Sequence, residues 1–497
     1  YVQDNFSVSD RLNLTLGLRM DIPLFFDTPS ENVPFNEWMA SKGWKYRTNS
    51  KLNSTPLFSP RLGFRWNVDK EGRFLLRGGA GIFTGRIPFV WLSNNFANTG
   101  VQLSTYRVSA STNPDAVKSL SVILDPAKQT QNADKLTASG SQTINVFDKD
   151  FKFPQSLRAN LALDFELGGI DWTAEAIYSK TLNDIAYRNL VVDLTGQTLG
   201  EVIPSLSFDR RPMLKKIEGA DTYSGIYALH NTSKGYTYNL SLTGRKRFDF
   251  GLDVTASYTY MKSKGQNNGT SSVAQSNWQY NYTIGNPNDA ELANSSFNIP
   301  HSVRAAAFYT KKWKSNHATT VGLIYNGSSG LSYAVCYNGD LNGDTGNNDL
   351  LYIPTDAEID RMKFKATSDY TEEQQKANFK AWLANDDYMK KHRGEYYKRN
   401  ADNEKFEHHF DLHLSHRFDF MIGKELRGLE ISFDVVNIGN LFNSRWGRTS
   451  ASNGYYNPVT YKGDGSFQFL HEADYNMRSY NDYYSRWRGQ VGMKFTF

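Results

Sequence analysis

The chain has 497 residues, with 56 basic and 51 acidic residues spread along its length, 14% aromatic residues and a mean hydropathy of −0.57. No stretch approaches the roughly 18 uninterrupted apolar residues of a transmembrane helix, so a helical membrane protein is excluded. No concentrated basic stretch contains interleaved aromatic residues, which gives no case for a nucleic-acid partner. The single cysteine, Cys336, excludes an intrachain disulfide.

The first predicted element is a strand at residues 11–20, RLNLTLGLRM. Leucine or methionine occupies every even position from 12 to 20, and polar residues or glycine occupy the odd positions between them. Because successive side chains of a strand point to opposite faces, one face requires an apolar medium and the other requires water. Similar two-faced ribbons follow at residues 60–66, 156–167, 236–247, 252–261, 303–309, 319–325, 405–418, 429–436 and 487–497.

Three features indicate that the apolar medium is a lipid bilayer. Many ribbons approach the roughly 9–11 residues that a tilted transmembrane strand needs. Their polar faces mix charges, such as Arg158, Asp164 and Glu166, which we interpret as a hydrated charge network, whereas their apolar faces carry no charge. Connections also alternate in length, with short ones at residues 8–10, 68–72, 168–169 and 248–251 and long ones at residues 21–56, 86–152, 181–234, 263–298, 328–404 and 438–485.

Short turns at one rim and long loops at the other are typical of outer-membrane barrels. The sequence therefore predicts an all-β protein, a transmembrane antiparallel β-barrel with about thirteen strands in this segment. Bacterial single-chain barrels have an even number of strands, so we expect residues 1–497 to form the C-terminal part of one barrel domain. Aromatic residues near the strand ends are expected to form girdles at the bilayer interface, namely Trp66, Trp91, Tyr178, Tyr258, Tyr260, Tyr309, Tyr325 and Trp487.

The long connections are predicted to be partly folded extracellular loops, and residues 328–404 carry the clearest signals. Thr371 and Gln374 have the spacing of a capping box at the start of a helix. Apolar residues follow at helical spacing and basic residues precede Gly394, so a short helix is predicted within residues 371–393. A folded loop on the outer surface indicates that the protein has something to hold or to cover.

Several segments resemble TonB-dependent outer-membrane transporters. The N-terminal YVQDNFSVSDRLNLTLGLRMD resembles a strand–turn–strand of that family, and SPRLGFRW followed by LLRGGAGIFTGRIP resembles its next hairpin. The terminal RWRGQVGMKFTF resembles the last strand, ending in phenylalanine, that the barrel-assembly machinery of Gram-negative bacteria recognises. Together with GDLNGDTGNNDLLYIP, HRGEYYKRN and VVNIGNLFN, these segments are similar to the Oar-like branch found in Bacteroidetes and some other bacteria.

The resemblance implies a 22-stranded barrel with a plugged lumen, so about nine strands, the plug and the TonB-contacting segment would precede Tyr1. In that family TonB, driven by the proton-motive force, pulls the plug to admit a ligand. The resemblance thus implies a multi-pass protein of the cell outer membrane that actively imports an unidentified ligand, with outer-membrane lipid and the TonB complex as partners. Two alternatives stay open: a surface binding or structural barrel that displays its loops to a partner such as a lipoprotein, and a passive porin.

The segment GDLNGDTGNNDL is the best candidate metal site. Asp340, Asn342 and Asp344 place oxygen ligands at alternate positions around a turn, and Asp349 follows. Hard oxygen ligands in such a turn suit Ca²⁺, and no organic cofactor is expected. The segment departs from an EF-hand loop, because threonine stands at the sixth position in place of glycine and leucine at the twelfth in place of a bidentate glutamate. The alternative is an Asx-rich surface turn without metal.

No other group of residues predicts metal binding or catalysis. His409 and His413 share a strand face, but four residues at about 3.4 Å each separate them by roughly 14 Å, too far to bind one zinc ion. The chain has no phosphate-binding loop and no nucleophile elbow, so it is not predicted to be an enzyme and no catalytic residue is assigned. Some loop aromatics suit both substrate contact and loop packing, and the sequence does not separate these roles: Trp278, Tyr280, Tyr282, Tyr455 and Tyr456.

Overall fold

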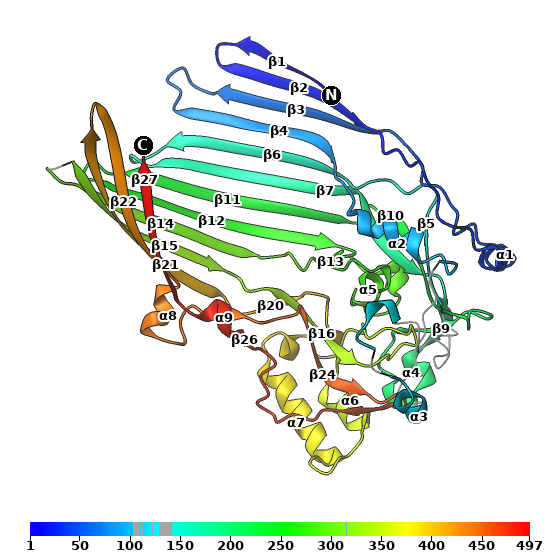
Figure 1. The fold of residues 1–497 in the computed structure, drawn as a ribbon. Coiled ribbons are helices and arrows are strands. Elements are labelled where there is room, and N and C mark those ends of the chain that lie inside the picture. Colours follow the sequence, from blue (N-terminus) through cyan, green and yellow to red (C-terminus); the bar gives the residue numbers. More distant parts are fainter. Residues whose placement is uncertain (103–109, 111–112, 122, 129–141, 315) are drawn as a thin grey trace.

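The computed structural model describes residues 1–102, 110, 113–121, 123–128, 142–314 and 316–497. The main element of these residues is a long, curved antiparallel sheet, which we call the wall (Figure 1). Its path contains thirteen strands, because three of the sixteen described strands in the sheet lie off that path. None of the described helices has the length and apolar character needed to cross a membrane.

The wall strands follow one another in chain order, and each pairs antiparallel with its neighbours. The strand number predicted from the sequence is therefore confirmed for the described residues. The strands are β1 (Val2–Ser9), β2 (Leu12–Asp21), β3 (Leu57–Asn67), β4 (Phe74–Thr84), β6 (Gln155–Glu166), β7 (Asp171–Asn189), β11 (Gly235–Arg247), β12 (Leu252–Gly265), β14 (His301–Lys312), β15 (His317–Ser328), β21 (Glu407–Ile422), β22 (Glu425–Val436) and β27 (Arg488–Thr496).

The register of these strands collects the apolar side chains on one face of the wall. Leu16 lies opposite Leu62, and Leu323 lies opposite Leu412, so apolar residues continue from strand to strand. Leu16, Leu62 and Leu323 are 46%, 48% and 46% exposed, so no second sheet buries them within the described residues. A face of exposed leucines on a wide antiparallel sheet is the outward apolar band of a barrel that sits in lipid.

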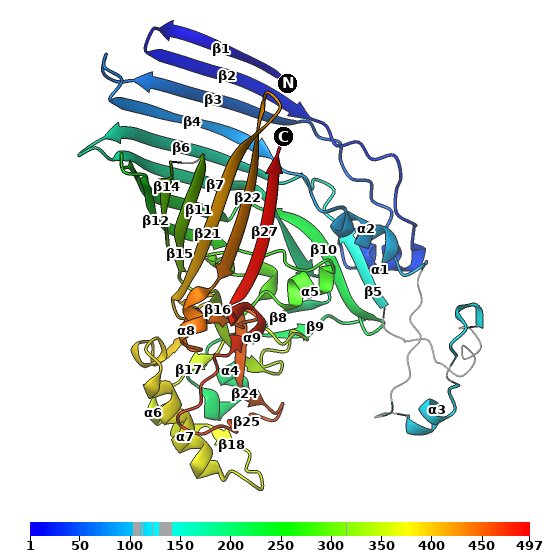
Figure 2. The ribbon, with the colours of Figure 1, turned by 60° about the vertical axis from the view of Figure 1, so that its left-hand side comes forward.

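Short turns and long connections lie at opposite ends of the wall (Figures 1 and 2). The turn after β11 shows how the tight end is built, because Gly251 has a φ of 98°, a conformation that favours glycine. The other end carries six long connections, and we call their described residues the cap. They lie within residues 22–56, 85–154, 190–234, 266–300, 329–406 and 437–487, numbered here first to sixth.

The cap has its own secondary structure. Its strands are β5 (Gln142–Phe147), β8 (Val192–Thr198), β9 (Pro212–Lys216), β10 (Tyr223–Thr232), β13 (Ala293–Asn294), β16 (Ser332–Asn338), β17 (Tyr352–Ile353), β18 (Lys363–Phe364), β19 (Glu395–Tyr396), β20 (Asp402–Asn403), β23 (Thr449–Ser450), β24 (Tyr455–Tyr461), β25 (Ser466–Gln468) and β26 (Tyr480–Asn481). Its helices are α1 (Val33–Ser41), α2 (Phe89–Ala97), α3 (Pro114–Lys118), α4 (Leu199–Val202), α5 (Ala274–Gln279), α6 (Asp356–Arg361), α7 (Glu372–Asn385), α8 (Ile438–Phe442) and α9 (Asp482–Ser485), with 3₁₀ turns at Pro204–Leu206, Pro287–Asp289 and Met389–Lys391.

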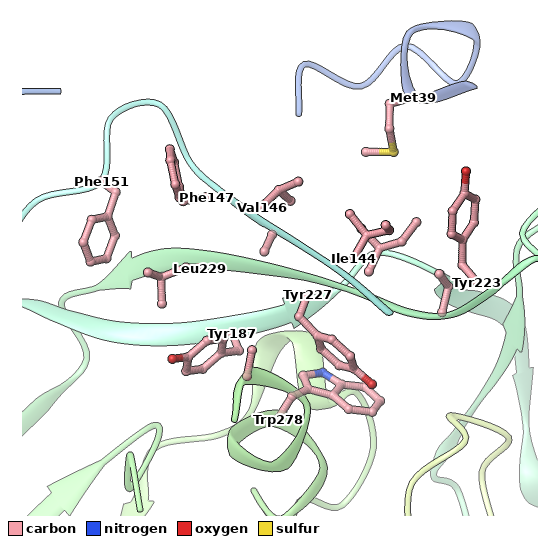
Figure 3. Close-up of a cluster of buried hydrophobic side chains, with 14 of the residues drawn as sticks. Met39, Ile144, Val146, Phe147, Phe151, Tyr187, Tyr223, Tyr227, Leu229 and Trp278 are labelled. Carbon is pink, nitrogen blue, oxygen red and sulfur yellow. The ribbon is translucent and has the colours of Figure 1, made fainter. Parts of the chain in front are cut away.

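A first hydrophobic cluster joins the first four long connections (Figure 3). It combines Met39 of α1, Ile144 of β5, Tyr227 of β10 and Trp278 of α5, all of them buried. The rings of Tyr227 and Trp278 lie 5.9 Å apart between centroids. Segments that are far apart in the sequence therefore share one core, to which Ile185 and Tyr187 at the end of β7 also belong.

A second hydrophobic cluster joins the third, fifth and sixth long connections. Phe379 of α7 is fully buried and packs against Phe469, with 5.2 Å between ring centroids. Leu206 brings the third connection into the same cluster. Since the third connection belongs to both clusters, parts of all six connections form one folded body, whereas α3 has no buried residue and belongs to neither cluster.

The helix predicted in the fifth connection is confirmed, but it is shorter than expected. The Thr371 hydroxyl accepts a hydrogen bond from the Gln374 backbone N–H at 3.2 Å, and the Gln374 side chain accepts one from the Thr371 N–H at 2.8 Å. The helix ends at Asn385, because Asp386 adopts an extended conformation. The basic residues expected in its last turn lie instead in the separate 3₁₀ turn Met389–Lys391.

Two further expectations are corrected. Residues 181–234 are not wholly a loop, because β7 continues to Asn189 and pairs with β10, which in turn runs parallel to β5. Trp91 is not a girdle residue: it lies in α2, 6.5 Å from the ring of Tyr187, and donates a hydrogen bond to the Ser271 carbonyl at 2.7 Å. Trp487, another predicted girdle residue, lies directly before β27. The remaining predicted girdle residues lie on the apolar face of the wall: Trp66, Tyr178, Tyr258, Tyr260, Tyr309 and Tyr325.

Candidate functional site

The polar face of the wall carries ion pairs between neighbouring strands. Arg77 of β4 donates through Nε to Asp164 of β6 at 2.8 Å and lies 3.9 Å from Glu175 of β7. Thr173 donates to the other oxygen of Asp164 at 2.7 Å. A charge network of the predicted kind is present, although the guanidinium of Arg158 lies over an aromatic ring instead of joining it.

A second group of charges lies on the same face, nearer the C-terminal end of the wall. The His413 Nδ1 atom lies 2.6 Å from the Asp434 carboxylate, and Arg417 donates to Asp419 at 2.8 Å. These side chains are 26–38% exposed. Partly exposed pairs of both signs contribute little to stability, so this face is a hydrated surface along which a polar solute or a second polar surface can lie.

The predicted metal site is the turn of residues 340–349, which follows β16. The Asp340 carboxylate accepts a hydrogen bond from the backbone N–H of Thr345 at 2.8 Å. The Asn342 Oδ1 atom accepts one from the backbone N–H of Asp344 at 3.0 Å. Asn342 and Asp344 are fully buried. The structure thus places these three predicted ligands in one tight turn inside the cap.

Asp349, the fourth predicted ligand, lies against a buried arginine. Arg211 donates through Nη1 to Asp349 and through Nε to Asp209, both at 3.0 Å. The other Asp349 oxygen accepts the Leu341 backbone N–H at 2.7 Å. Burial opposes the charge of Arg211, but Asp209 and Asp349 raise its pKa overall. Asp349 therefore anchors the end of the turn through an ion pair.

Acidic side chains concentrate in this turn. Burial raises the pKa of Asp344, and the neighbouring carboxylates of Asp349 and Asp340 raise it further. Burial also raises the pKa of Asp340. No three His, Cys, Asp or Glu side chains of the described chain are arranged to hold a metal ion, so an ion in this turn would need amide or carbonyl oxygens as well.

The turn lies where three long connections meet. The backbone N–H of Leu214, from the third connection, donates to the Asn342 carbonyl at 2.7 Å. The Asn342 side chain donates to the carbonyl of Gly285, from the fourth connection, at 2.9 Å. The Thr283 N–H donates to the Asn348 carbonyl at 3.1 Å. A change in the turn would therefore reach the third, fourth and fifth connections together.

Most of the loop aromatics that suited two roles act in packing. Trp278 belongs to the first hydrophobic cluster, and Tyr282 is buried with its ring 5.0 Å from that of Tyr455. Tyr456 is half-buried against the second cluster. Tyr280 is 51% exposed, and of these residues it alone presents an open ring for contact with a solute.

Two buried arginines of the cap were not found from the sequence. Arg211 is fully buried while its neighbour Arg210 is exposed, and the Asp349 partner is 138 residues away. Arg399 donates to the carbonyls of Gly265 at 2.8 Å and Glu291 at 3.1 Å, linking the fourth and fifth connections. Neither position has a local signal, because each is defined by contacts with distant segments.

A wall with one exposed apolar face, one charged face and all long connections at one end defines an outer-membrane β-barrel protein. The chain belongs to the outer membrane beta barrel domain family, whose match covers residues 1–459. The protein is therefore located in the outer membrane and crosses it with its strands. Functionally curated proteins show no match to this sequence.

The solved structures that match this chain include a transporter of the outer membrane, a siderophore receptor and a copper transporter. The outer membrane transporter YddB from Escherichia coli has a TM-score of 0.43 and 13% identity, covering 98% of this chain and 45% of that one. The siderophore receptor PirA from Acinetobacter baumannii has a TM-score of 0.39 and 11% identity, covering 99% of this chain and 45% of that one. The copper transporter OprC has a TM-score of 0.40 and 10% identity, covering 99% of this chain and 47% of that one. The chain spans less than half the length of each of these proteins.

Proposed function

We propose that this chain forms the wall and cap of an active outer-membrane transporter, which imports a ligand through a plugged barrel and is energised by TonB and the proton-motive force. The observation that carries this proposal is that all six long connections fold into one body at the end of a wall whose other face is charged. The sequence resemblance to TonB-dependent transporters, and to their Oar-like branch, supports the same function.

The cap favours ligand capture over simple display of flexible loops. Ordering a loop costs about 1–2 kcal/mol of backbone entropy per residue. The two hydrophobic clusters offset this cost by burying large side chains such as Phe35, Phe379 and Phe469 completely. A surface that is already ordered loses less entropy when it binds, so such a cap suits a binding site for a ligand.

The polar face of the wall suits a lumen that is filled and then emptied. Pairs such as Arg77–Asp164 and His413–Asp434 are satisfied within the wall. A plug against this face would therefore leave few charges unpaired when it moves away. This property fits energised opening of a plugged barrel.

Uptake by living cells tests the proposal while the ligand is still unidentified. Cells that carry the full-length protein, cells that lack it and cells that lack TonB would be grown in the same rich medium. Mass spectrometry would then follow which compounds disappear from the medium. We expect at least one compound to be depleted only when both the transporter and TonB are present. Equal depletion in the TonB-deficient cells would contradict energised import.

A conductance measurement separates the remaining alternatives. The full-length protein would be inserted into planar lipid bilayers under an applied voltage. We expect no stable open current, because a plug closes the lumen. A steady ohmic current would instead identify a passive porin. A closed barrel, combined with no compound whose depletion depends on the protein, would identify a surface binding or structural role.

A further inference from the structure

The turn that follows β16 contains buried polar atoms without partners. Asp344 and Asn348 are both fully buried. Within the described residues, the Oδ2 atom of Asp344 makes no hydrogen bond, and the Asn348 amide makes none of good geometry, although it interacts with the Asp344 carboxylate. Buried polar groups are nearly always paired, and leaving one unpaired costs free energy. The buried Asp344 oxygen without a partner indicates that a ligand completes the turn.

The two side chains point to the same place. A Cβ atom added at Gly346 would lie 2.7 Å from Asp344 Oδ1 and 2.5 Å from Asn348 Nδ2, so both groups converge on the backbone of this glycine. Gly343 closes the turn on its other side, with a φ of 81°. A Cβ there would lie 2.5 Å from the Leu214 carbonyl oxygen, so only glycine fits.

The charges around the turn do not balance. Arg211 forms ion pairs with Asp209 and Asp349, whereas Asp340 and Asp344 have no ion-pair partner among the described residues. A buried carboxylate without a cation is strongly unfavourable in its charged form. One divalent cation would compensate both remaining charges.

The available ligand atoms are oxygens. Asp340, Asn342 and Asp344 stand at alternate positions of the turn, where hard oxygen ligands suit calcium. The Oδ1 atom of Asp340 accepts hydrogen bonds from the backbone N–H groups of Gly343 and Asp344, at 2.7 and 3.2 Å. The Oδ2 atom accepts only the Thr345 N–H, at 2.8 Å, so this oxygen keeps a lone pair for a metal ion. Calcium accepts amide and carbonyl oxygens and a flexible geometry, whereas Mg²⁺ demands a near-ideal octahedron.

We propose that this turn binds one Ca²⁺ ion through Asp340, Asn342 and Asp344, and that the ion locks the third, fourth and fifth long connections to one another. Asn342 is the link, since its carbonyl accepts from Leu214 and its side chain donates to Gly285. Asp349 positions the turn through Arg211 and is not a ligand. The site goes beyond the proposed transport function and does not depend on TonB or on a plug.

Direct binding tests the site in the full-length protein purified in detergent. The protein would be stripped with EGTA and titrated with CaCl₂ by calorimetry. We expect one site per chain in the wild type, with an affinity in the range of about 10⁻⁴–10⁻³ M that is typical of extracellular modules. Asp344→Asn should lose this binding, whereas Asp387→Asn, an exposed carboxylate of the same connection, should keep it. Absent binding in the wild type, or equal binding by Asp344→Asn, would overturn the proposal.

Amide hydrogen exchange supplies a second measurement, which reports on the structure around the site in the wild type and in the variant, with and without Ca²⁺. In the wild type, Ca²⁺ should slow amide exchange in peptides covering residues 209–216, 281–286 and 339–350. Asp344→Asn removes a buried charge, so in EGTA it should fold at least as well as the wild type, and Ca²⁺ should not change its exchange. If Ca²⁺ did not change exchange in the wild type, or changed it equally in Asp344→Asn, the proposed locking of the three connections by Ca²⁺ would be contradicted. Uptake results do not enter this test, so the two proposals fail separately.

Discussion

The wall and the cap place the same kinds of residues in opposite surroundings. In the wall Leu323 is 46% exposed on the apolar face, and the pair Arg417–Asp419 is 38% and 30% exposed on the polar face. In the cap Phe379 and Arg211 are both fully buried. The wall therefore leaves its apolar side chains to the bilayer and its charges to water, whereas the cap buries both as a soluble protein does.

Because of this difference, different interactions stabilise the wall and the cap. The wall is held by continuous antiparallel hydrogen bonding and by lipid on its apolar face, so its polar pairs are weakly coupled to the fold. The cap is held by two hydrophobic clusters and a few buried charges, so single residues matter more there. Substitutions that report on the two regions separately can test this difference, and amide hydrogen exchange measures both regions in one experiment.

The largest effect is expected from removing the buried cation of the cap. Arg211→Ala leaves Asp209 and Asp349 buried without their partner and should destabilise the cap by about 3–5 kcal/mol. Exchange in cap peptides should accelerate while the wall stays protected. Arg210→Ala, which removes an exposed neighbour, is the control and should change little. Equal effects of the two substitutions would show that the buried ion pair is not a centre of cap stability.

A charge on the apolar face of the wall should have the next largest effect. Leu323→Arg lies in the middle of β15 and should cost about 2–4 kcal/mol, because the guanidinium would face hydrocarbon. Asn326→Arg, on the polar face of the same strand, should be tolerated. Unfolding by guanidinium chloride in lipid vesicles measures both. If Leu323→Arg proved harmless, the apolar face would not contact lipid.

Loss of the helix cap in the fifth connection should have a smaller effect. Thr371→Ala removes the hydroxyl that accepts the Gln374 N–H and should cost about 1 kcal/mol, seen as faster exchange in α7. Glu373→Ala changes an exposed residue of the same helix and keeps the cap intact. A similar acceleration in both variants would mean that packing of α7 alone determines its stability.

The smallest effect is expected on the polar face of the wall. Arg417→Ala breaks a partly exposed ion pair with Asp419 and should cost no more than about 1 kcal/mol. Ser432→Ala serves as a neutral change on the neighbouring strand. A loss above about 2 kcal/mol in guanidinium unfolding would show that a further part of the protein packs against this face.

The wall could be predicted almost completely from the sequence. Alternation in RLNLTLGLRM assigns each side chain of β2 to a face, and the same period repeats in the other strands. Prediction worked because consecutive residues of a strand between lipid and water face the two media in turn, so apolar and polar residues alternate. It failed at residues 181–189, where β7 leaves the bilayer and both of its faces become buried or mixed, so the period no longer separates strand from loop.

The cap could be predicted only in fragments. The start of α7 at Thr371 follows from a local capping signal, but its end at Asn385 does not. Spacing proposed Asp340, Asn342, Asp344 and Asp349 as one ligand set, and it gave no sign of the ion pair that the tertiary structure adds between Arg211 and Asp349. Calcium binding itself stays a prediction until titration.

The sequence alone determined the membrane medium, the strand number and the face of each wall residue, because these depend on neighbours two positions apart. Only the tertiary structure decided that six loops form one cap and which charges are buried together. The physical reason is the sequence separation of the contacts. Arg211 and Asp349 are 138 residues apart, and a contact between such distant residues produces no periodic pattern in the sequence.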